Sequence, residues 1–171
     1  MNNELCRMTG AEFPLFAFSH CRDVVAAVSR AGGFGVLGCT QHTPKTIRQE
    51  LQWIDDHVGG KPYGLDVLIP ENMATAGERD VTYNSLKTRV PQQHYAYAKD
   101  LLKKYDIDIE QAQFSNDKPQ PFDHGMALEV LEAAFEHPIR LIANALGVPP
   151  PAMIEMGRKH GVPVAALVGA K

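Results

Sequence analysis

The sequence predicts an α/β fold in which parallel strands alternate with helices along an incomplete (β/α)8 barrel. The first observation is the stretch FPLFAFSHCRDVVAAVSRAGGFGVLG, residues 13–38, whose pattern is typical of strand, helix, glycine turn and strand. The second is that another helix and strand follow at once, and the third is that the same rhythm returns near residue 126. Parallel strands of this kind carry their ligand sites at their carboxyl ends.

Apolar runs and glycines define the first strand–helix–strand unit. Residues 15–18 form a short apolar run after a proline, which predicts a fully buried strand. Valines at helical spacing predict a helix over 23–31, with Asp23 placed to cap its first turn. The glycines at 32–33 end that helix, because glycine commonly follows a helix C-terminus, and a second strand covers 34–37.

The second unit has a clear helix start. Thr43 followed by Pro44 matches the preference for threonine as N-cap and for proline at the first helical position. We expect this helix to run over 43–58 and to bury one apolar stripe, formed by Ile47, Leu51, Ile54 and Val58. A third strand is predicted over 63–69, where Pro70 ends it.

Residues 71–123 interrupt this rhythm and are predicted to form a helical insert or lid after the third strand. The segment is polar and contains several prolines, with one expected helix over 91–105 and a loop-like stretch over 115–123. A connection this long inside a compact domain more often serves binding than simple linkage. The alternation then resumes, with a helix, a strand, a helix and a strand over 126–135, 139–143, 151–160 and 162–168.

We therefore interpret residues 1–171 as a single domain that forms the N-terminal part of a TIM barrel, about its first five parallel strands. The 171 residues fall short of the roughly 250 that a closed (β/α)8 barrel typically needs. We expect the natural product to be longer.

Composition narrows the class of protein. The chain is 44% hydrophobic and 22% charged, with 17 basic and 20 acidic residues, an ordinary balance for a globular domain. It has no Lys/Arg cluster of the kind that marks a nucleic-acid partner, no apolar run near the ~20 residues of a membrane span, and no secretory pattern. Three cysteines without CxxC spacing fit reduced thiols. We therefore expect a cytoplasmic protein with no nucleic-acid or membrane partner.

Four stretches of the chain resemble the N-terminal half of nitronate monooxygenases, formerly called 2-nitropropane dioxygenases: FPLFAFS, DVVAAVSRAGGFGVLG, TPKTIRQELQWI and KPYGLDVLIP. The tail IRLIANALGVPPPAMIEMGRKHGVPVAALVG is similar to the fourth and fifth βα units of that family. The segment AVSRAGGFGVLG is the most specific part, although related flavin barrels, including the enoyl-reductases of fatty-acid synthesis, share it. The resemblance implies an FMN-dependent (β/α)8 oxidoreductase that oxidises alkyl nitronates with dioxygen.

The same resemblance implies that FMN lies at the C-terminal mouth of the barrel. The flavin ring would approach the backbone after the first strand, at Ala17, Phe18 and Ser19, and would pass close to Gly38 at the end of the second strand. Many members carry Ala-Pro-Met after the first strand, so Phe18 and Ser19 are departures. Asp66 stands where the family usually presents an asparagine to the flavin, and an ionised Asp can accept but not donate a hydrogen bond.

The family's catalytic histidine, and the strands whose loops bind the FMN phosphate, would lie beyond residue 171. The catalytic residue is therefore unknown from this sequence, and we expect the chain by itself to be inactive. His20, directly after the first strand, is retained as a candidate because the ends of barrel strands carry the chemistry. Some members place a lysine at the end of the fifth strand, where this chain has Leu167.

Several polar residues near the strand ends also allow a structural interpretation. His20 could be an exposed loop residue and Asp66 a loop cap, rather than contacts to flavin or substrate. Cys21 and Cys39 fit small buried hydrophobic residues better than reactive thiols. His42 fits a solvated loop residue before a helix cap.

Other motifs do not predict a dinucleotide-binding, substrate-pocket or metal site. The glycines at 32–38 precede a strand, so they lack the GxGxxG spacing that opens a dinucleotide-binding helix. His94, Tyr95 and Tyr97 fit an amphipathic helix that covers a core better than the wall of a pocket. No histidines show metal-ligand spacing, so we expect no metal site.

Three functions from different classes stay open. The chain could be part of a nitronate monooxygenase-like FMN enzyme, part of another flavin barrel oxidoreductase such as an enoyl-thioester reductase, or a non-catalytic half-barrel that associates with a partner. For the first we expect a small-molecule substrate, a nitronate or similar, together with dioxygen. Because a half-barrel exposes sheet edges and apolar strand faces, we also expect a homodimer or a missing C-terminal segment to cover them.

Overall fold

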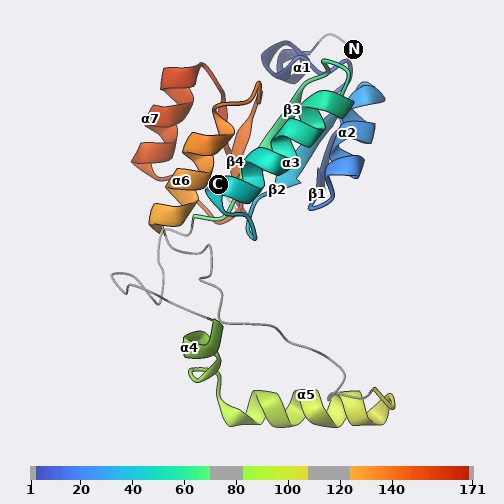
Figure 1. The fold of residues 1–171 in the computed structure, drawn as a ribbon, viewed down its shortest axis with the longest axis vertical. Coiled ribbons are helices and arrows are strands. Elements are labelled where there is room, and N and C mark those ends of the chain that lie inside the picture. Colours follow the sequence, from blue (N-terminus) through green and yellow to red (C-terminus); the bar gives the residue numbers. More distant parts are fainter. Residues whose placement is uncertain (1–2, 70–82, 108–123, 170–171) are drawn as a thin grey trace. The chain divides into compact units, whose positions relative to one another are not determined.

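The chain forms two compact units in the computed structural model, which describes residues 3–69, 83–107 and 124–169 (Figure 1). The first unit comprises Met1–Met73 and Pro121–Lys171, and the second comprises Ala74–Gln120. The role of residues 71–123 as an insert or lid stays a prediction. None of the described helices is both long and apolar enough to span a membrane.

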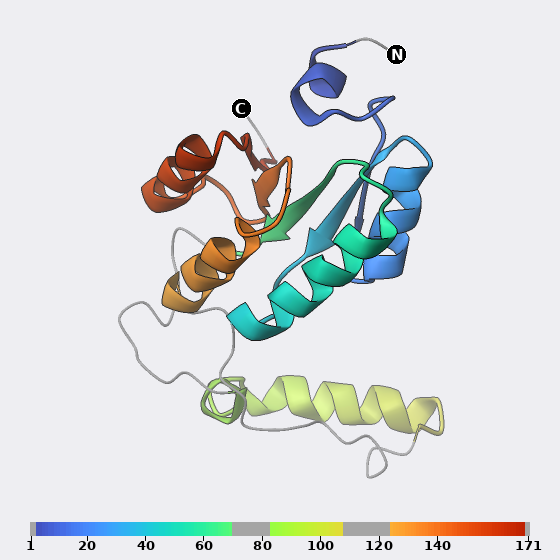
Figure 2. The same ribbon diagram turned by 45° about the horizontal axis from the view of Figure 1, so that its top comes forward.

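The first unit contains one sheet of five strands in the order β1-β2-β3-β4-β5. All four neighbouring pairs are parallel, so the five carboxyl ends meet at one edge. The helices that follow the strands lie on one face of the sheet (Figure 2). In chain order the elements are α1 (Glu4–Thr9), β1 (Phe16–Ser19), α2 (Arg22–Arg30), β2 (Phe34–Gly38), α3 (Pro44–His57), β3 (Tyr63–Val67), α6 (His124–Ala134), β4 (Ile142–Asn144), α7 (Pro151–His160) and β5 (Val164–Ala166). This confirms the predicted fold, part of an α/β barrel.

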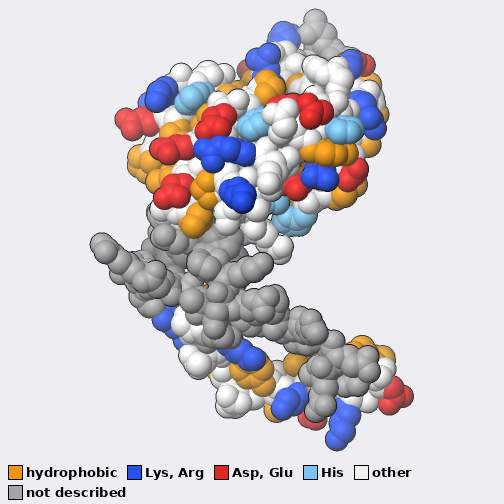
Figure 3. All heavy atoms as spheres, in the orientation of Figure 1, with side chains coloured by type: hydrophobic (Ala, Val, Ile, Leu, Met, Phe, Trp, Pro, Cys, Tyr) orange, Lys and Arg blue, Asp and Glu red, His pale blue; other side chains and the backbone are white. Residues whose placement is uncertain are grey.

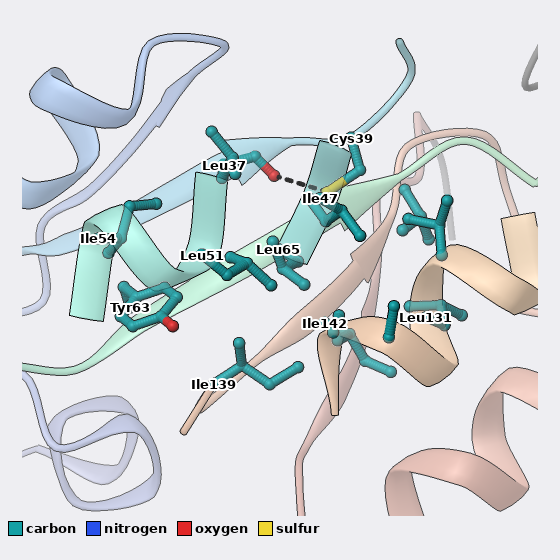
Figure 4. Close-up of a cluster of buried hydrophobic side chains, with 14 of the residues drawn as sticks. Leu37, Cys39, Ile47, Leu51, Ile54, Tyr63, Leu65, Leu131, Ile139 and Ile142 are labelled. Atoms are coloured by element: carbon teal, nitrogen blue, oxygen red, sulfur yellow. Dashed lines mark hydrogen bonds between the residues drawn. The ribbon is translucent and has the colours of Figure 1, made fainter. Parts of the chain in front are cut away.

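Helix α3 forms as predicted, with both the expected N-terminal cap and the expected buried apolar stripe. The Thr43 hydroxyl accepts a hydrogen bond from the backbone N–H of Thr46, and the Thr46 side chain accepts one from the backbone N–H of Thr43, a capping box. The stripe predicted over this helix is buried against the sheet. Figure 4 shows this helix-side core, in which Leu37, Ile47, Leu51, Ile54, Tyr63, Leu65, Leu131, Ile139 and Ile142 pack together.

The first strand differs from the prediction, since β1 is not fully buried. It lies at the edge of the sheet with β2 as its partner, and its residues alternate between exposed and half-buried. Phe16 and Phe18 lie on the face opposite the helices, where Phe18 is 55% exposed. The exposed apolar side chains of this strand therefore mark a surface that further residues could cover.

Some helix and strand starts also differ from the prediction. Cys21, not Asp23, is the N-cap of α2. The backbone N–H of Cys21 donates to Ser19 Oγ at 3.0 Å. Strand β4 begins at Ile142, because the preceding residues run past the start of β3 and the N–H of Arg140 donates to Tyr63 before the ladder begins. Helix α1, which the sequence pattern did not predict, precedes the sheet.

The face of the sheet opposite the helices holds a smaller cluster of buried residues. Phe34 and Val36 from β2 pack there with Ala11 and Leu141. The Phe16 and Phe34 rings lie 5.1 Å apart between centroids. Strand alternation places Phe18, Gly38 and Asp66 on this same face, nearer the carboxyl edge. On this face the apolar cluster is thus followed, toward the carboxyl edge, by the carboxyl group of Asp66.

The second unit contains α4 (Tyr83–Lys87) and α5 (Gln92–Lys104). The Tyr95 hydroxyl donates to the carbonyl of Lys87 at 2.7 Å, which joins the two helices. In the described part of the chain α5 buries none of its side chains, and Tyr97 is 71% exposed. The expected helix is present, but it does not cover a core there. The loop-like stretch over 115–123 lies outside the described residues.

Surface charge on the first unit is mixed in sign. Figure 3 shows Lys and Arg side chains interspersed with Asp and Glu side chains on the face in view. Several are paired: Arg48 with Glu136 at 2.6 Å, Arg22 with Glu50 at 3.2 Å, and Lys61 with Glu12 at 2.5 Å. The face in view thus carries charges of both signs side by side.

Candidate active site at the carboxyl edge of the sheet

The structure brings the predicted site residues to one edge of the sheet. Gly38 is the register partner of Asp66, and Asp66 is the partner of Ala143 on β4. Phe18 lies on the same face as Gly38 and Asp66, whereas Ala17 and Ser19 belong to the helix side of β1. Ala17 and Ser19 can therefore contribute only backbone groups on the site face.

Gly38 forms the floor on which two rings rest. A Cβ atom at this position would lie 2.7 Å from ring atoms of both Phe18 and His20. The two rings meet edge to face with centroids 5.0 Å apart. Because both side chains are exposed, each can rotate away from Gly38 without disturbing the core. The space that we expected a flavin ring to approach is thus lined by Phe18 and His20.

Asp66 is the most unusual group at this edge. Its side chain is 7% exposed, and its Oδ1 atom has no hydrogen-bond partner among the described residues. Burial raises the pKa of the carboxyl group from an ordinary 3.8 to about 6, an effect that the nearby His20 partly opposes. A buried polar atom without a partner is costly, so it marks a place where a ligand group or a proton fits.

His20 is oriented by the backbone of β2. Its Nδ1 atom lies 3.3 Å from the carbonyl oxygen of Gly38. Because a carbonyl oxygen can only accept a hydrogen bond, Nδ1 carries the proton and donates, which leaves the lone pair of a neutral ring on Nε2. His20 can therefore accept a proton at Nε2 on the exposed side of the site.

Two of the neighbouring residues differ from their expected environments. Cys39 is buried as expected, and burial raises the pKa of its thiol far above the usual range, so it stays protonated. Cys21 is exposed, contrary to the expectation of burial, because it sits on the loop that opens α2. His42 is half-buried rather than solvated, and burial lowers its pKa.

Asn144 is a site-positioning residue that the sequence reasoning missed. It is fully buried at the end of β4, and its side chain bonds the backbone after β3: Oδ1 accepts from the N–H of Ile69 at 2.9 Å, and Nδ2 donates to the Ile69 carbonyl at 3.0 Å. Nδ2 also lies 3.2 Å from the carbonyl oxygen of Leu146. An asparagine at the end of an otherwise apolar strand is the sequence feature from which this role could have been predicted. Its amide holds together the loops that border Asp66.

A cavity lies at the opposite end of the sheet. It measures about 470 Å³ and lies between α1 and the residues that precede β3 and β4, with Arg7, Lys61 and Arg140 in its wall. Beside it, Asp55 accepts from the Tyr63 hydroxyl at 2.6 Å and contacts His137 Nδ1 at 2.7 Å. Residues at the amino ends of barrel strands usually serve stability, so we place the candidate site at the carboxyl edge.

The position where some members of the resembled family carry a lysine is exposed. Leu167, just after β5, is 58% exposed. Within residues 3–69, 83–107 and 124–169, no group of three or more His, Cys, Asp or Glu side chains could hold a metal ion. The polar groups that the described site offers are thus those of Asp66, His20 and the strand-end backbone.

Comparison with known sequences finds relatives that are longer than this chain. No protein-family model matches it. A Mycobacterium tuberculosis protein named "Putative monooxygenase Rv1533" is 44% identical over 99% of this chain and 46% of its own length. A Staphylococcus haemolyticus protein named "Probable nitronate monooxygenase" is 28% identical over 46% of this chain and 23% of its own length. The chain therefore spans less than half of each curated relative.

Comparison with solved structures supports the fold. Nitroalkane oxidase from Streptomyces ansochromogenes matches 95% of this chain and 41% of its own, with a TM-score of 0.58 and 18% identity. FabK from Thermotoga maritima matches 99% of this chain and 38% of its own, with a TM-score of 0.60 and 15% identity. At these identities the match concerns the fold alone. The sequence matches thus make the chain similar to part of the length of proteins named as monooxygenases, and the structural matches support the barrel fold.

Proposed function

We propose that this chain is part of an FMN-dependent oxidoreductase that resembles nitronate monooxygenase and oxidises alkyl nitronates with dioxygen. The similarity to two relatives named as monooxygenases supports the reaction class. The observation that carries the proposal in the structure is the buried, unpaired carboxyl oxygen of Asp66 at the carboxyl edge of a parallel sheet. Ligands of such sheets bind at that edge.

The residues at this edge fit a flat ring with a polar border. Gly38 and Ala143 flank Asp66 in register, and neither has a side chain larger than a methyl group. A planar ligand can therefore lie against the strands while its polar border meets Asp66. Phe18 offers an exposed aromatic surface beside it. A bound flavin would supply the redox chemistry, while the protein binds, orients and excludes water.

The chain's own residues would act in three ways. Asp66 would orient the ring through its carboxyl group, and Phe18 would shield one side from water. His20 is the candidate proton acceptor, because its Nδ1 bond to Gly38 leaves Nε2 available for a substrate proton. Nitronates are already deprotonated, so His20 would matter most for neutral nitroalkanes.

Cover for the apolar sheet face is part of the proposal. Strands β1 and β5 form the two edges of the described sheet, and Phe16, Phe18 and Leu167 are exposed. We expect further strands, from a longer chain or from a second copy, to lie there and to be needed for turnover. In the cell we expect such an enzyme to work in the cytoplasm.

The test loads the purified chain with FMN and measures oxygen uptake with an alkyl nitronate. It is run on the chain alone and with the remaining part of the M. tuberculosis relative added as a separate polypeptide. We expect flavin binding in both cases and nitronate-dependent oxygen uptake in the second. Flavin-dependent reduction of an enoyl thioester, without nitronate turnover, would instead favour the enoyl-thioester reductase alternative. A protein that binds no flavin would contradict the proposal.

A further inference from the structure

We infer that flavin binding at the carboxyl edge takes up one proton from solvent, and that Asp66 is the group that receives it. The inference rests on the proposed function and adds a regulation by pH to the same site. It follows from the burial of Asp66 and from its neighbours on the two adjacent strands.

The surroundings of Asp66 disfavour the charged form of its carboxyl group. Its side chain is 93% buried, and Oδ1 has no partner among the described residues to stabilise a negative charge. The neighbours in register are Gly38 and Ala143, which offer no side-chain donor. A ring laid against these two residues would remove the remaining solvent contact of Asp66. Removing water from a carboxylate without supplying a cation favours the neutral acid.

The surrounding charges do not reverse this preference. From the β1 end, His20 faces Asp66 and favours its charged form, but this effect is smaller than that of burial. From the β2 end, Cys39 is a buried, protonated thiol and adds no charge. Burial lowers the pKa of His42, which disfavours a positive charge there. Among the described groups, His20 is thus the one cation source for Asp66, and a bound ring would compete with it for space over Gly38.

Protonation also changes what Asp66 can do for the ligand. The ionised group can only accept hydrogen bonds, whereas the acid has one O–H to donate. A protonated Asp66 can therefore replace an amide donor toward an acceptor on the ring. Since the free carboxyl has a pKa of about 6, it is mostly ionised at pH 8, and the proton must come from solvent when the ring binds.

The experiment measures riboflavin binding to the purified chain by flavin fluorescence between pH 5 and pH 8.5. Riboflavin is the probe because the phosphate of FMN itself titrates near pH 6. We expect the dissociation constant to rise up to about 50-fold from pH 6 to pH 8, as linkage to one group with a pKa of about 6 requires. Calorimetry in two buffers of different ionisation enthalpy should count close to one proton taken up at pH 8 and almost none at pH 5.

Two variants separate Asp66 from its titrating neighbour. Asp66→Asn keeps the shape of the side chain and supplies a permanent amide donor, so it should bind riboflavin with no pH dependence and no proton uptake. His20→Gln should retain both effects. Proton uptake that persists in Asp66→Asn and disappears in His20→Gln would overturn the inference.

The remaining outcomes distinguish this inference from the proposed function. Wild-type binding that is tight but independent of pH would overturn the inference and leave a flavin site standing. Failure of the wild type and both variants to bind riboflavin or FMN would overturn the proposed function and the inference together. The proton count on the wild type decides the question even if a variant does not fold.

Discussion

Replacing Asp66 by asparagine should stabilise the ligand-free protein at neutral pH, an unusual result for a substitution at a buried polar position. The carboxyl group has a pKa of about 6 in the folded chain against an ordinary 3.8, because burial disfavours its charge. Each pH unit between these two values corresponds to about 1.4 kcal/mol, so the charged group costs the folded state about 3 kcal/mol. The amide carries no charge and avoids that cost.

The sign of the pH dependence follows from which state holds the proton. Between pH 3.8 and about 6 the folded protein binds the Asp66 proton more tightly than the unfolded chain does. Stability of the wild type should therefore fall as the pH rises through this window and then level off above it. For Asp66→Asn the same contribution should be absent, so the two proteins should differ most near pH 7.5 and converge near pH 4.

Urea denaturation followed by circular dichroism at half-unit pH steps tests this reasoning. We expect Asp66→Asn to gain up to about 3 kcal/mol in the free energy of unfolding at pH 7.5. Asp56→Asn is the matched control, because Asp56 is an exposed carboxylate on α3 and should show no such gain. An Asp66→Asn protein that is less stable than the wild type at pH 7.5 would refute the account, since it would show that the ionised carboxylate has a stabilising partner.

Four further substitutions test the packing around the site and at the opposite end of the sheet. Gly35→Ala should lower the free energy of unfolding by about 3 kcal/mol, because the new Cβ would clash with the backbone of α2. Gly38→Ala should lower it by less than about 1 kcal/mol, since only two exposed rings must turn. Denaturation curves compare the two variants, and equal losses of stability would contradict the reasoning. Asn144→Ala should cost about 2 kcal/mol and speed amide exchange in the loop after β3; unchanged exchange would argue against its role. Tyr63→Phe should cost about 1.5–3 kcal/mol at pH 7, because it removes the hydroxyl bonded to Asp55, and a neutral result would show that the bond adds no net stability.

Local patterns in the sequence were sufficient to predict most of the secondary structure. The Thr43-Pro44 start and the apolar stripe of α3 depend on residues a few positions apart, so they can be recognised without tertiary information. The same holds for α7, whose bounds at Pro151 and His160 agree with the prediction. Strand order was predictable as well, because successive strands joined by helices pair in parallel.

Burial at the edges and the state of Asp66 could not be predicted in that way. An apolar run indicates β1 but does not say that the strand has one neighbour and exposes Phe18. A carboxyl after a strand indicates a site but not that its Oδ1 lacks a partner, which depends on Gly38 and Ala143 from two other strands. Asn144 acts on a loop 75 positions earlier in the chain.

The sequence by itself therefore determined the alternation of helices and strands and the parallel sheet, because those features follow from periodicity and from the connections between neighbours; the ligand site at the carboxyl edge stays a prediction. Only the tertiary structure decided which groups at that edge are buried, paired or charged. Those properties depend on water excluded by residues distant in the chain, and desolvation is what distinguishes Asp66 from an ordinary surface carboxylate.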